Sequence, residues 1–340
     1  MKNFKRTTTL IMIAVFAIVL AACSGGDGDG TEGSSDAQTL RVGHTLTEST
    51  ATHIALESFK ETVEANSDGA ITVELYPNGQ LYSSERSAIE AVQGGNMEMT
   101  VTATAPVVGF VPEYKVLDLP FLFPDNETAY EALDGELGST LLEKLPEAGL
   151  KGLVYGETGM RQLSTGNKPI EKPEDLEGVK MRTMENDVHI EAFETYGASP
   201  EPFAFGELYS ALQQNTFDGM ENPLNLIDQM KFYEVQEYLT ISNHAYTATL
   251  FFINNDLFEG MSEENQTVIE EAAVEFRDSQ RELAQENAQK GMEAVQGEME
   301  ITELTEDQRQ AFIDASQPVY DTFQDDIGQE LMDLALSYRE

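Results

Sequence analysis

The chain has 340 residues, of which 61 are acidic and 20 are basic, so its formal net charge at neutral pH is −41. So acidic a chain excludes nucleic acid and anionic membrane surfaces as partners, because both carry dense negative charge. It also means that any site for an anionic ligand must supply its own positive side chains.

The N-terminus is typical of an export signal. Two lysines and an arginine within the first six residues precede an apolar run over residues 10–20. This run is shorter than the ~20 residues that a membrane-spanning helix needs, so a signal peptide over residues 1–22 is favoured over a transmembrane helix. The segment Leu20-Ala21-Ala22-Cys23 resembles the lipobox of bacterial lipoproteins, in which the cysteine is diacylated.

Cys23 is the only cysteine of the chain. A lone thiol could also be a nucleophile or half of an intermolecular disulfide, but its place directly after the apolar run favours lipidation. The following Gly-, Ser- and Asp-rich residues predict a flexible tether over residues 23–38. Its Asp27-Gly28-Asp29-Gly30 segment begins like a calcium loop, yet Glu32 and Gln38 stand where that loop needs Gly and Glu.

The first elements after the tether alternate between strand and helix. Residues 40–42 and 71–75 alternate apolar with polar side chains, as strands do. Between them the apolar residues Ile54, Leu56, Phe59 and Val63 predict a helix. The sequence therefore predicts a strand-helix-strand unit at the start of the folded part.

The same alternation continues along the chain. The segment Tyr76-Pro77-Asn78-Gly79 predicts a break, and a helix over residues 87–93 is expected to stop at Gly94-Gly95. Strands are expected at 152–155 and 247–253 and a helix at 207–214. An α/β architecture follows, and about 300 residues exceed one typical core, so two lobes are expected.

The C-terminal part is predicted to be helical. Residues 263 to about 298 are rich in Glu, Gln and Ala without proline, and Ser262 can cap this long helix. Thr305 with Gln308 three residues later predicts a capping box for another helix. Residues 318–336 are expected to be helical as well, so this part is predicted to brace the two lobes.

Motifs for catalysis are missing from the sequence. It has no Gly-x-Ser-x-Gly, His-Glu-x-x-His, phosphate loop or Cys-x-x-Cys. Four histidines are scattered without the spacing of metal ligands: His44, His53, His189 and His244. The sequence therefore predicts neither an enzyme nor a cofactor or metal site.

Eight motifs in a fixed order identify a family. They are Leu119-Pro120-Phe121-Leu122-Phe123, Gly159-Met160-Arg161-Gln162-Leu163-Ser164, the run from Lys172 to Arg182, Gly197-Ala198-Ser199-Pro200, the run from Phe203 to Gln213, Asp218-Gly219-Met220-Glu221-Asn222-Pro223, the run from Lys231 to Val235, and Asn243-His244-Ala245. With these motifs the chain resembles the solute-binding proteins of tripartite ATP-independent periplasmic (TRAP) transporters, of the dicarboxylate-binding DctP-like type. The resemblance covers about residues 40–258 and continues more loosely to the end.

The resemblance implies a two-lobed α/β fold like that of class II periplasmic binding proteins, with hinge strands and long C-terminal helices. It implies a first lobe over residues 39–159 plus 248–287 and a second over 160–247 plus 288–340. Such a protein, most often a monomer, captures a small organic acid outside the cytoplasm by lobe closure. It then delivers the acid to a small and a large membrane subunit driven by an ion gradient.

The resemblance also assigns the site. Arg182 follows a turn at Gly178, and its guanidinium is expected to bind the ligand carboxylate with two parallel hydrogen bonds. From spacing alone, a salt bridge with one of the many acids would be the better interpretation. Arg161 is expected as a second cation near the carboxylate. Asn222 is expected to donate its amide, although it could also be a plain turn residue.

Three further residues are assigned from the resemblance. Phe205 is expected to form an apolar wall against the ligand, with a place in the core as the alternative. His244 is expected in a hydrogen-bond network that responds to closure, and His44 on the first-lobe side of the site.

The ligand is expected to be a C4-dicarboxylate or related small acid, with uronates next. Residues 101–106 carry no charge, which argues against the charged first-lobe contacts of sialate-binding relatives. A binding protein of an ATP-driven importer would not be expected to carry the Arg161, Arg182 and Asn222 motifs in this order. An extracellular hydrolase would need a nucleophile or metal site, and neither is visible. The expected location is extracytoplasmic, on a lipid anchor in the cell membrane.

Overall fold

The computed structural model describes residues 38–339, which belong to one compact unit. The predicted signal peptide, the lipidation site at Cys23 and residues 23–37 of the predicted tether lie outside the described residues, whereas Gln38, the last residue of that tether, begins the first strand. Within the described part, no helix combines the length and the apolar character that a bilayer crossing requires.

Ten strands form one mixed sheet in the order β2-β1-β3-β9-β4-β7-β5-β6, with β8 beside β4 and β10 beside β8. The strands are β1 (Gln38–Gly43), β2 (Ile71–Tyr76), β3 (Met99–Ala103), β4 (Leu150–Thr165), β5 (Lys180–Thr183), β6 (Ser199–Pro202), β7 (Gly219–Pro223), β8 (Tyr238–Ile241), β9 (Tyr246–Asn254) and β10 (Glu300–Glu303).

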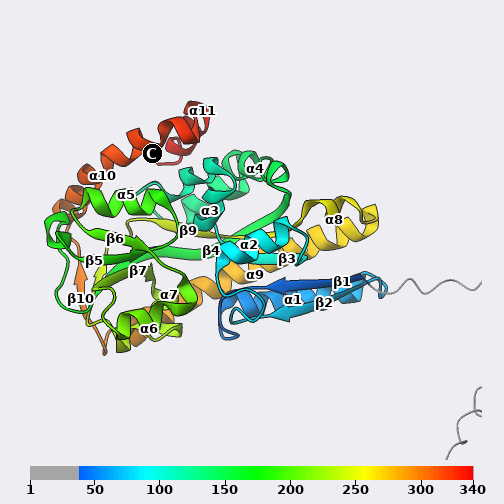
Figure 1. The fold of residues 1–340 in the computed structure, drawn as a ribbon, viewed down its shortest axis with the longest axis horizontal. Coiled ribbons are helices and arrows are strands. Elements are labelled where there is room, and N and C mark those ends of the chain that lie inside the picture. Colours follow the sequence, from blue (N-terminus) through cyan, green and yellow to red (C-terminus); the bar gives the residue numbers. More distant parts are fainter. Residues whose placement is uncertain (1–37, 340) are drawn as a thin grey trace, which may run out of the picture. The chain divides into compact units, whose positions relative to one another are not determined.

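Helices surround this sheet (Figure 1). They are α1 (Ala51–Asn66), α2 (Glu85–Gln93), α3 (Asn126–Asp134), α4 (Glu136–Leu142), α5 (Asp187–Thr195), α6 (Leu208–Gln213), α7 (Leu224–Gln229), α8 (Asn255–Glu259), α9 (Glu263–Val295), α10 (Glu306–Ile327) and α11 (Gln329–Leu336). Short 3₁₀ helices include η1 (Ala105–Gly109), η2 (Pro112–Asp118) and η5 (Phe205–Glu207).

Strand β4 passes through both parts of the sheet. Its residues 150–160 pair with β9, and its residues 161–165 pair with β7. We call β1, β2, β3, β9 and residues 150–160 sheet A, and residues 161–165 with β5, β6, β7, β8 and β10 sheet B. The long strands β4 and β9 run along the middle of the fold in Figure 1. The α/β, two-lobed architecture expected from the sequence is confirmed, whereas the boundaries given above for the lobes stay a prediction.

The first predicted unit forms as expected. Strands β1 and β2 are parallel, and α1 connects them. Thr50 caps α1, and Leu56, Phe59 and Val63 are fully buried along one stripe of it. Ile54 lies off this stripe and is 38% exposed, so the apolar face is narrower than the sequence pattern predicted.

Helix α9 connects the two parts of the fold. Ser262 caps it as predicted, its side chain accepting a hydrogen bond from the backbone N–H of Asn265. The helix packs against α1, α7 and β4, which are elements of both parts.

The C-terminal helices form as expected, except that the helical stretch predicted over residues 318–336 is interrupted at Gly328. The capping box of Thr305 and Gln308 is present at the start of α10. Pro318 lies inside α10, and the chain breaks at Gly328, which has a φ of +86°, before α11 begins.

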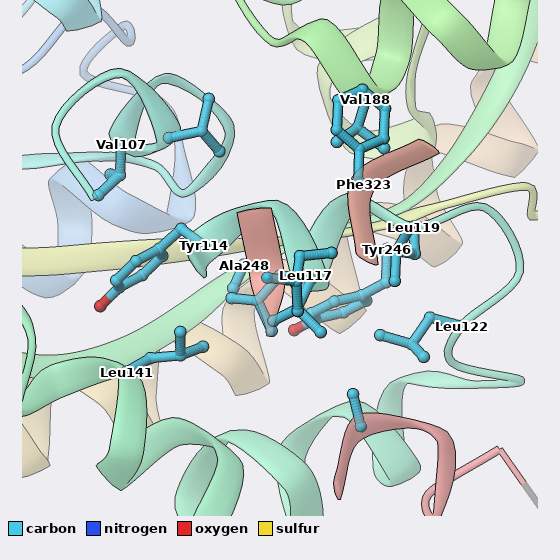
Figure 2. Close-up of a cluster of buried hydrophobic side chains, with 14 of the residues drawn as sticks. Val107, Tyr114, Leu117, Leu119, Leu122, Leu141, Val188, Tyr246, Ala248 and Phe323 are labelled. Carbon is cyan, nitrogen blue, oxygen red and sulfur yellow. The ribbon is translucent and has the colours of Figure 1, made fainter. Parts of the chain in front are cut away.

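The main hydrophobic core joins segments that are far apart in sequence. Figure 2 draws Leu117 of η2, Ala248 of β9, Val188 of α5 and Phe323 of α10 as members of one cluster of buried side chains. All four side chains are buried. Helix α10 thus contacts both η2, which follows sheet A, and α5, which belongs with sheet B.

Candidate functional site

A cavity that is partly open to solvent lies where sheets A and B meet. The lining residues are Leu46, Glu85, Val101, Thr102, Ala103, Thr158, Arg161, Arg182, Met184, Phe205, Asn222, Leu226 and Thr249. Four of the six residues predicted to bind ligand are therefore brought together: Arg161, Arg182, Phe205 and Asn222.

Arg182 reaches the cavity from β5, after a turn in which Gly178 has a φ of +71°. The side chain is buried, and its Nε donates to the carbonyl oxygen of Phe203 at 2.9 Å. Its Nη1 is buried as well but has no hydrogen-bond partner among residues 38–339. Burial lowers the pKa of Arg182 to about 10, so the guanidinium is still charged at neutral pH. A buried cation with an unused donor is suited to bind an anion.

Arg161 on β4 is paired within the protein. Its Nε and Nη2 donate to the two carboxylate oxygens of Glu221, and Nη2 also donates to the Glu221 carbonyl oxygen at 2.7 Å. Both side chains are almost completely buried. Its Nη1 lies 3.3 Å from the hydroxyl oxygen of Thr247. Arg161 therefore lines the cavity with a charge that Glu221 largely neutralises.

Glu221 is held as a carboxylate by its neighbours. Burial alone would raise its pKa, but the charge of Arg161 and the imidazoles of His189 and His244 hold this pKa well below its usual value. The nearest imidazole nitrogens lie 3.7 Å from Glu221 in His189 and 3.6 Å in His244. An ionised Glu221 in turn keeps Arg161 in place.

Asn222 and Phe205 complete the cavity on the side of sheet B. Asn222 on β7 pairs in register with Gln162 of β4. Its Oδ1 lies 3.4 Å from Nη2 of Arg161, and among residues 38–339 its Nδ2 has only the sulfur of Met220 as acceptor, at 3.1 Å. Phe205 is half-buried and packs edge-on against Phe232. The amide donor and the aromatic face thus both remain available to a ligand.

The two predicted histidines lie outside the cavity lining. His44 is buried, and its Nε2 lies 3.0 Å from Nδ1 of His53. Burial and the charge of His53 lower the pKa of His44 to about 3. His244 lies in a hydrogen-bonded group, with Nδ1 2.8 Å from the hydroxyl of Ser242. Their roles in ligand binding and closure stay predictions.

Sequence analysis missed the cavity wall on the side of sheet A. Glu85, the first residue of α2, also lines the cavity, and its Oε1 accepts a hydrogen bond from the backbone N–H of Ala103 at 2.8 Å. It is one of 61 acidic residues, and no pattern singled it out. Thr249 was also missed, whereas Val101, Thr102 and Ala103 belong to the stretch 101–106 in which first-lobe contacts were considered. Within residues 38–339, no group of three His, Cys, Asp or Glu residues is arranged to hold a metal ion.

Comparisons with known proteins show which family the chain matches. The model of the family described as bacterial extracellular solute-binding protein, family 7 (DctP) matches residues 42–326. The 2,3-diketo-L-gulonate-binding periplasmic protein YiaO of Escherichia coli K12 is 34% identical over 320 residues, which cover 94% of this chain and 95% of that protein.

Solved structures are similar over most of the chain. The sugar acid binding protein DctPAm of Advenella mimigardefordensis in complex with galactonate has a TM-score of 0.86 and 34% identity, covering 89% of this chain and 98% of that protein. A TRAP periplasmic solute binding protein of Shewanella oneidensis with bound succinate also has a TM-score of 0.86, at 28% identity, covering 89% of this chain and 100% of that protein.

Proposed function

The chain belongs to bacterial extracellular solute-binding protein family 7, the DctP family, and we propose that it captures a small carboxylate for a TRAP transporter. The observation that carries this proposal is the unused Nη1 of Arg182, buried in the cavity beside Asn222. A ligand carboxylate is the group that a buried guanidinium with free donors binds best. Relatives that bind succinate and galactonate support the ligand class.

The donors of the cavity can account for useful affinity. Hydrogen bonds to charged groups contribute about 1.5–3 kcal/mol each. Two such bonds from Arg182 and one from Asn222, together with the apolar contact of Phe205, support binding in the micromolar range, which corresponds to about 8 kcal/mol. Arg161 also lines the cavity with a positive charge, but the Glu221 carboxylate already neutralises most of it.

Closure follows from where the contacts lie. The cavity is lined from sheet A by Glu85 and Thr102, and from sheet B by Arg182 and Asn222. A ligand that contacts both sides stabilises the closed form relative to the open form. The free energy of this stabilisation cannot exceed the difference between the ligand's interactions with the two forms. We place the moving lobes at residues 39–159 plus 248–287 and 160–247 plus 288–340, with β4 and β9 as hinge strands. The closed form would dock on the small and large membrane subunits.

The proposal includes the way the protein is held outside the cytoplasm. Removal of residues 1–22 and lipidation of Cys23 would anchor the protein to the membrane, and residues 24–37 would tether it. Labelling of cells with a clickable palmitate analogue should mark the wild-type chain and not Cys23→Ser. Equal labelling of both would contradict the anchor. No catalytic step is part of the proposed function.

Binding is tested on the chain that begins at residue 24, which leaves the compact unit of residues 37–340 intact. Thermal shifts with a panel of dicarboxylates, sugar acids, keto acids, neutral sugars and amino acids should show stabilisation by an acid and none by its neutral analogue. Arg182→Ala should lose most of the affinity in calorimetry. Arg182→Lys should lose nearly as much, because an ammonium cannot form the two-pronged pair. Affinity of Arg182→Ala within a few-fold of wild type would refute the anchor.

A further inference from the structure

A line of buried ionisable side chains leads from the cavity to η2. Arg161 lines the cavity and is paired with Glu221 of β7. Nδ1 of His189 on α5 lies 3.7 Å from Oε1 of Glu221. Nε2 of the same imidazole lies 2.9 Å from Oδ1 of Asp118 at the end of η2. Basic and acidic groups thus alternate along this line, and we call these four residues the buried charge line.

The buried charge line is shut off from solvent. Each of its four side chains is at most 4% exposed. The chain neighbours of Asp118 and His189 belong to the apolar cluster of Figure 2, namely Leu117, Leu119 and Val188. Charges interact more strongly in such surroundings than in water, because little solvent is present to screen them. A change of charge at the far end of the line therefore affects an anion in the cavity.

His189 is protonated at neutral pH. Burial alone would lower its pKa, but the carboxylates of Asp118 and Glu221 raise this pKa from 6.5 to about 9. His244 is the other imidazole beside Glu221, with Nε2 3.6 Å from Oε2, and burial lowers its pKa. The buried charge line is therefore neutral as a whole, and His189 supplies one of its two positive charges.

The elements packed against α5 carry few other buried charges. Lys115 of η2 pairs with Asp187 at the start of α5 and with Asp326 of α10. Arg182 of β5 lines the cavity. The remaining charged side chains of α5, α10, β5 and β6 are at least partly exposed. Solvent therefore screens them, and the two carboxylates of the buried charge line decide the charge of the imidazole between them.

Asp118 is held in place from two directions. Its Oδ2 accepts a hydrogen bond from Nδ2 of Asn186 at 2.8 Å. Three residues further along the chain, Phe121 is buried and has a φ of +56°, which is unusual for a bulky side chain and persists only where contacts enforce it. Its backbone N–H donates to the carbonyl oxygen of His244 at 2.7 Å. The segment that carries Asp118 is thus fixed to the elements around Glu221.

We propose that Asp118 and His189 are positioning residues for ligand binding. Through Glu221 they keep Arg161 in the place and the charge state that an anionic ligand needs. Neither Asp118 nor His189 is among the residues that line the cavity. The inference rests on the proposed function and adds a control of affinity from outside the cavity. Loss of the proton of His189 gives the buried charge line a net negative charge, which repels an anion.

The test measures affinity against pH by calorimetry on the chain from residue 24, with succinate and D-galactonate, the ligands of two structural relatives, as probes. Wild-type affinity should be constant up to about pH 8 and fall about five-fold by pH 10, as His189 loses its proton. Asp118→Asn removes a carboxylate that raises the pKa of His189, so the fall should begin at least about one pH unit lower. His189→Gln should bind about ten-fold more weakly at pH 7 and show no fall up to pH 10, because the titrating group is gone.

Glu194→Gln is the matched control, because Glu194 is exposed on the same helix as His189 and the change also removes one negative charge. It should keep the wild-type pH profile, and melting curves should show that the variants are folded. A profile of Asp118→Asn that coincides with that of the wild type would overturn the inference, and so would a fall in His189→Gln as large as in the wild type. If Asp118→Asn does not fold, the profile of His189→Gln decides alone. Each of these outcomes leaves binding at Arg182 intact, whereas failure of the proposed function would appear as no dependence of acid binding on Arg182.

Discussion

Arg161 and Arg182 have the same side chain but different roles, because their surroundings differ. Both are buried at the same cavity. The guanidinium of Arg161 is engaged by a carboxylate of its own protein, whereas that of Arg182 keeps a donor without a partner. Removing one partner of a buried pair strands a charge, but removing an unpaired cation does not. The two arginines should therefore differ in what their loss costs.

Without ligand, Arg161→Ala should lower the free energy of unfolding by about 3–5 kcal/mol, because Glu221 would lose its main counter-charge in the interior. Arg182→Ala should change it far less, since no internal ion pair is broken. Urea unfolding of the ligand-free variants at pH 7 measures both values. A larger loss of stability in Arg182→Ala than in Arg161→Ala would contradict the division of roles.

Glu157 on β4 gives the fold a distinct pH dependence. The side chain is 2% exposed; Asn126 donates to its Oε1 at 3.2 Å, while Oε2 has no partner among the described residues. Burial raises the pKa of Glu157 from 4.5 to about 8, although the charge of Arg281 opposes this. Between pH 4.5 and about pH 8 the carboxyl group of Glu157 is deprotonated in the unfolded chain but protonated in the folded chain. This group therefore lowers the free energy of unfolding as pH rises through that window.

Glu157→Gln removes this contribution and keeps the acceptor for Asn126. The variant should gain stability relative to wild type as pH rises from 5.5 to 7.5, with a change of about 2 kcal/mol across the window. Arg281 should stay satisfied because it pairs with Asp134 at 2.7 and 2.9 Å. Denaturant unfolding at both pH values provides the measurement. A difference between the two proteins that does not change with pH would show that Glu157 titrates normally.

The sequence predicted the second-sheet side of the site and not the first. Arg161, Arg182, Phe205 and Asn222 lie in contiguous motifs that resemble a known family, and the structure brings all four to one cavity. Glu85 reaches the cavity only because α2 packs with its N-terminus beside β3. That is a tertiary arrangement which no local pattern encodes, so composition and periodicity could not separate Glu85 from the other acids.

At the scale of elements, hydrophobic periodicity and capping predicted α1, α9 and the start of α10 but not α3, α4, α5, α7 or α8, and one strand was predicted too short. The strand expected at residues 152–155 is the first part of β4, which continues to Thr165. The register of β4 against β9 shifts between Gly152 and Val154 and again between Glu157 and Gly159, and Gly159 has a φ of +120°. A bulge lets the strand bend from sheet A into sheet B without ending.

Helix α10 shows the same limit of local propensity. Proline normally ends a helix because it lacks an N–H and crowds the preceding turn. Pro318 is nevertheless inside α10, where the buried side chains of Phe312, Val319 and Phe323 continue one stripe on both sides of it. Burial of this apolar stripe stabilises the helix by more than the missing backbone hydrogen bond of Pro318 destabilises it. The sequence alone does not give the size of either contribution.

The contact of α9 with α7 depends on one glycine. A Cβ atom at Gly291 would lie 2.6 Å from the backbone carbonyl oxygen of Leu224, which cannot move away as a flexible side chain could. Gly291→Ala should therefore lower the free energy of unfolding by about 1–3 kcal/mol, in spite of the better helix propensity of alanine. Chemical denaturation measures this.

Gly297→Ala provides the control, since no atom lies within 4 Å of a Cβ at that position. It should leave stability within about 0.5 kcal/mol of wild type, as surface substitutions generally do. A gain of stability in Gly291→Ala would mean that α9 and α7 can move apart at no cost.

At the scale of the whole molecule, the net charge and the site oppose each other. A formal charge of −41 repels an anionic ligand at long range, while Arg182 attracts it only at contact distance. The Debye length is about 30 Å at 10 mM salt and about 8 Å at 150 mM. Added salt should therefore remove the long-range repulsion before it weakens the desolvated contact with Arg182.

The association rate constant for a carboxylate ligand should consequently rise several-fold between 10 and 150 mM salt, the reverse of electrostatically steered binding. The dissociation rate constant should change less, because it is set by buried contacts that ions reach poorly. Stopped-flow fluorescence of the tyrosines can follow both rates, as the chain has 12 tyrosines and no tryptophan. An association rate that falls with salt would mean that the local field of Arg161 and Arg182 extends beyond the cavity mouth and outweighs the acidic surface.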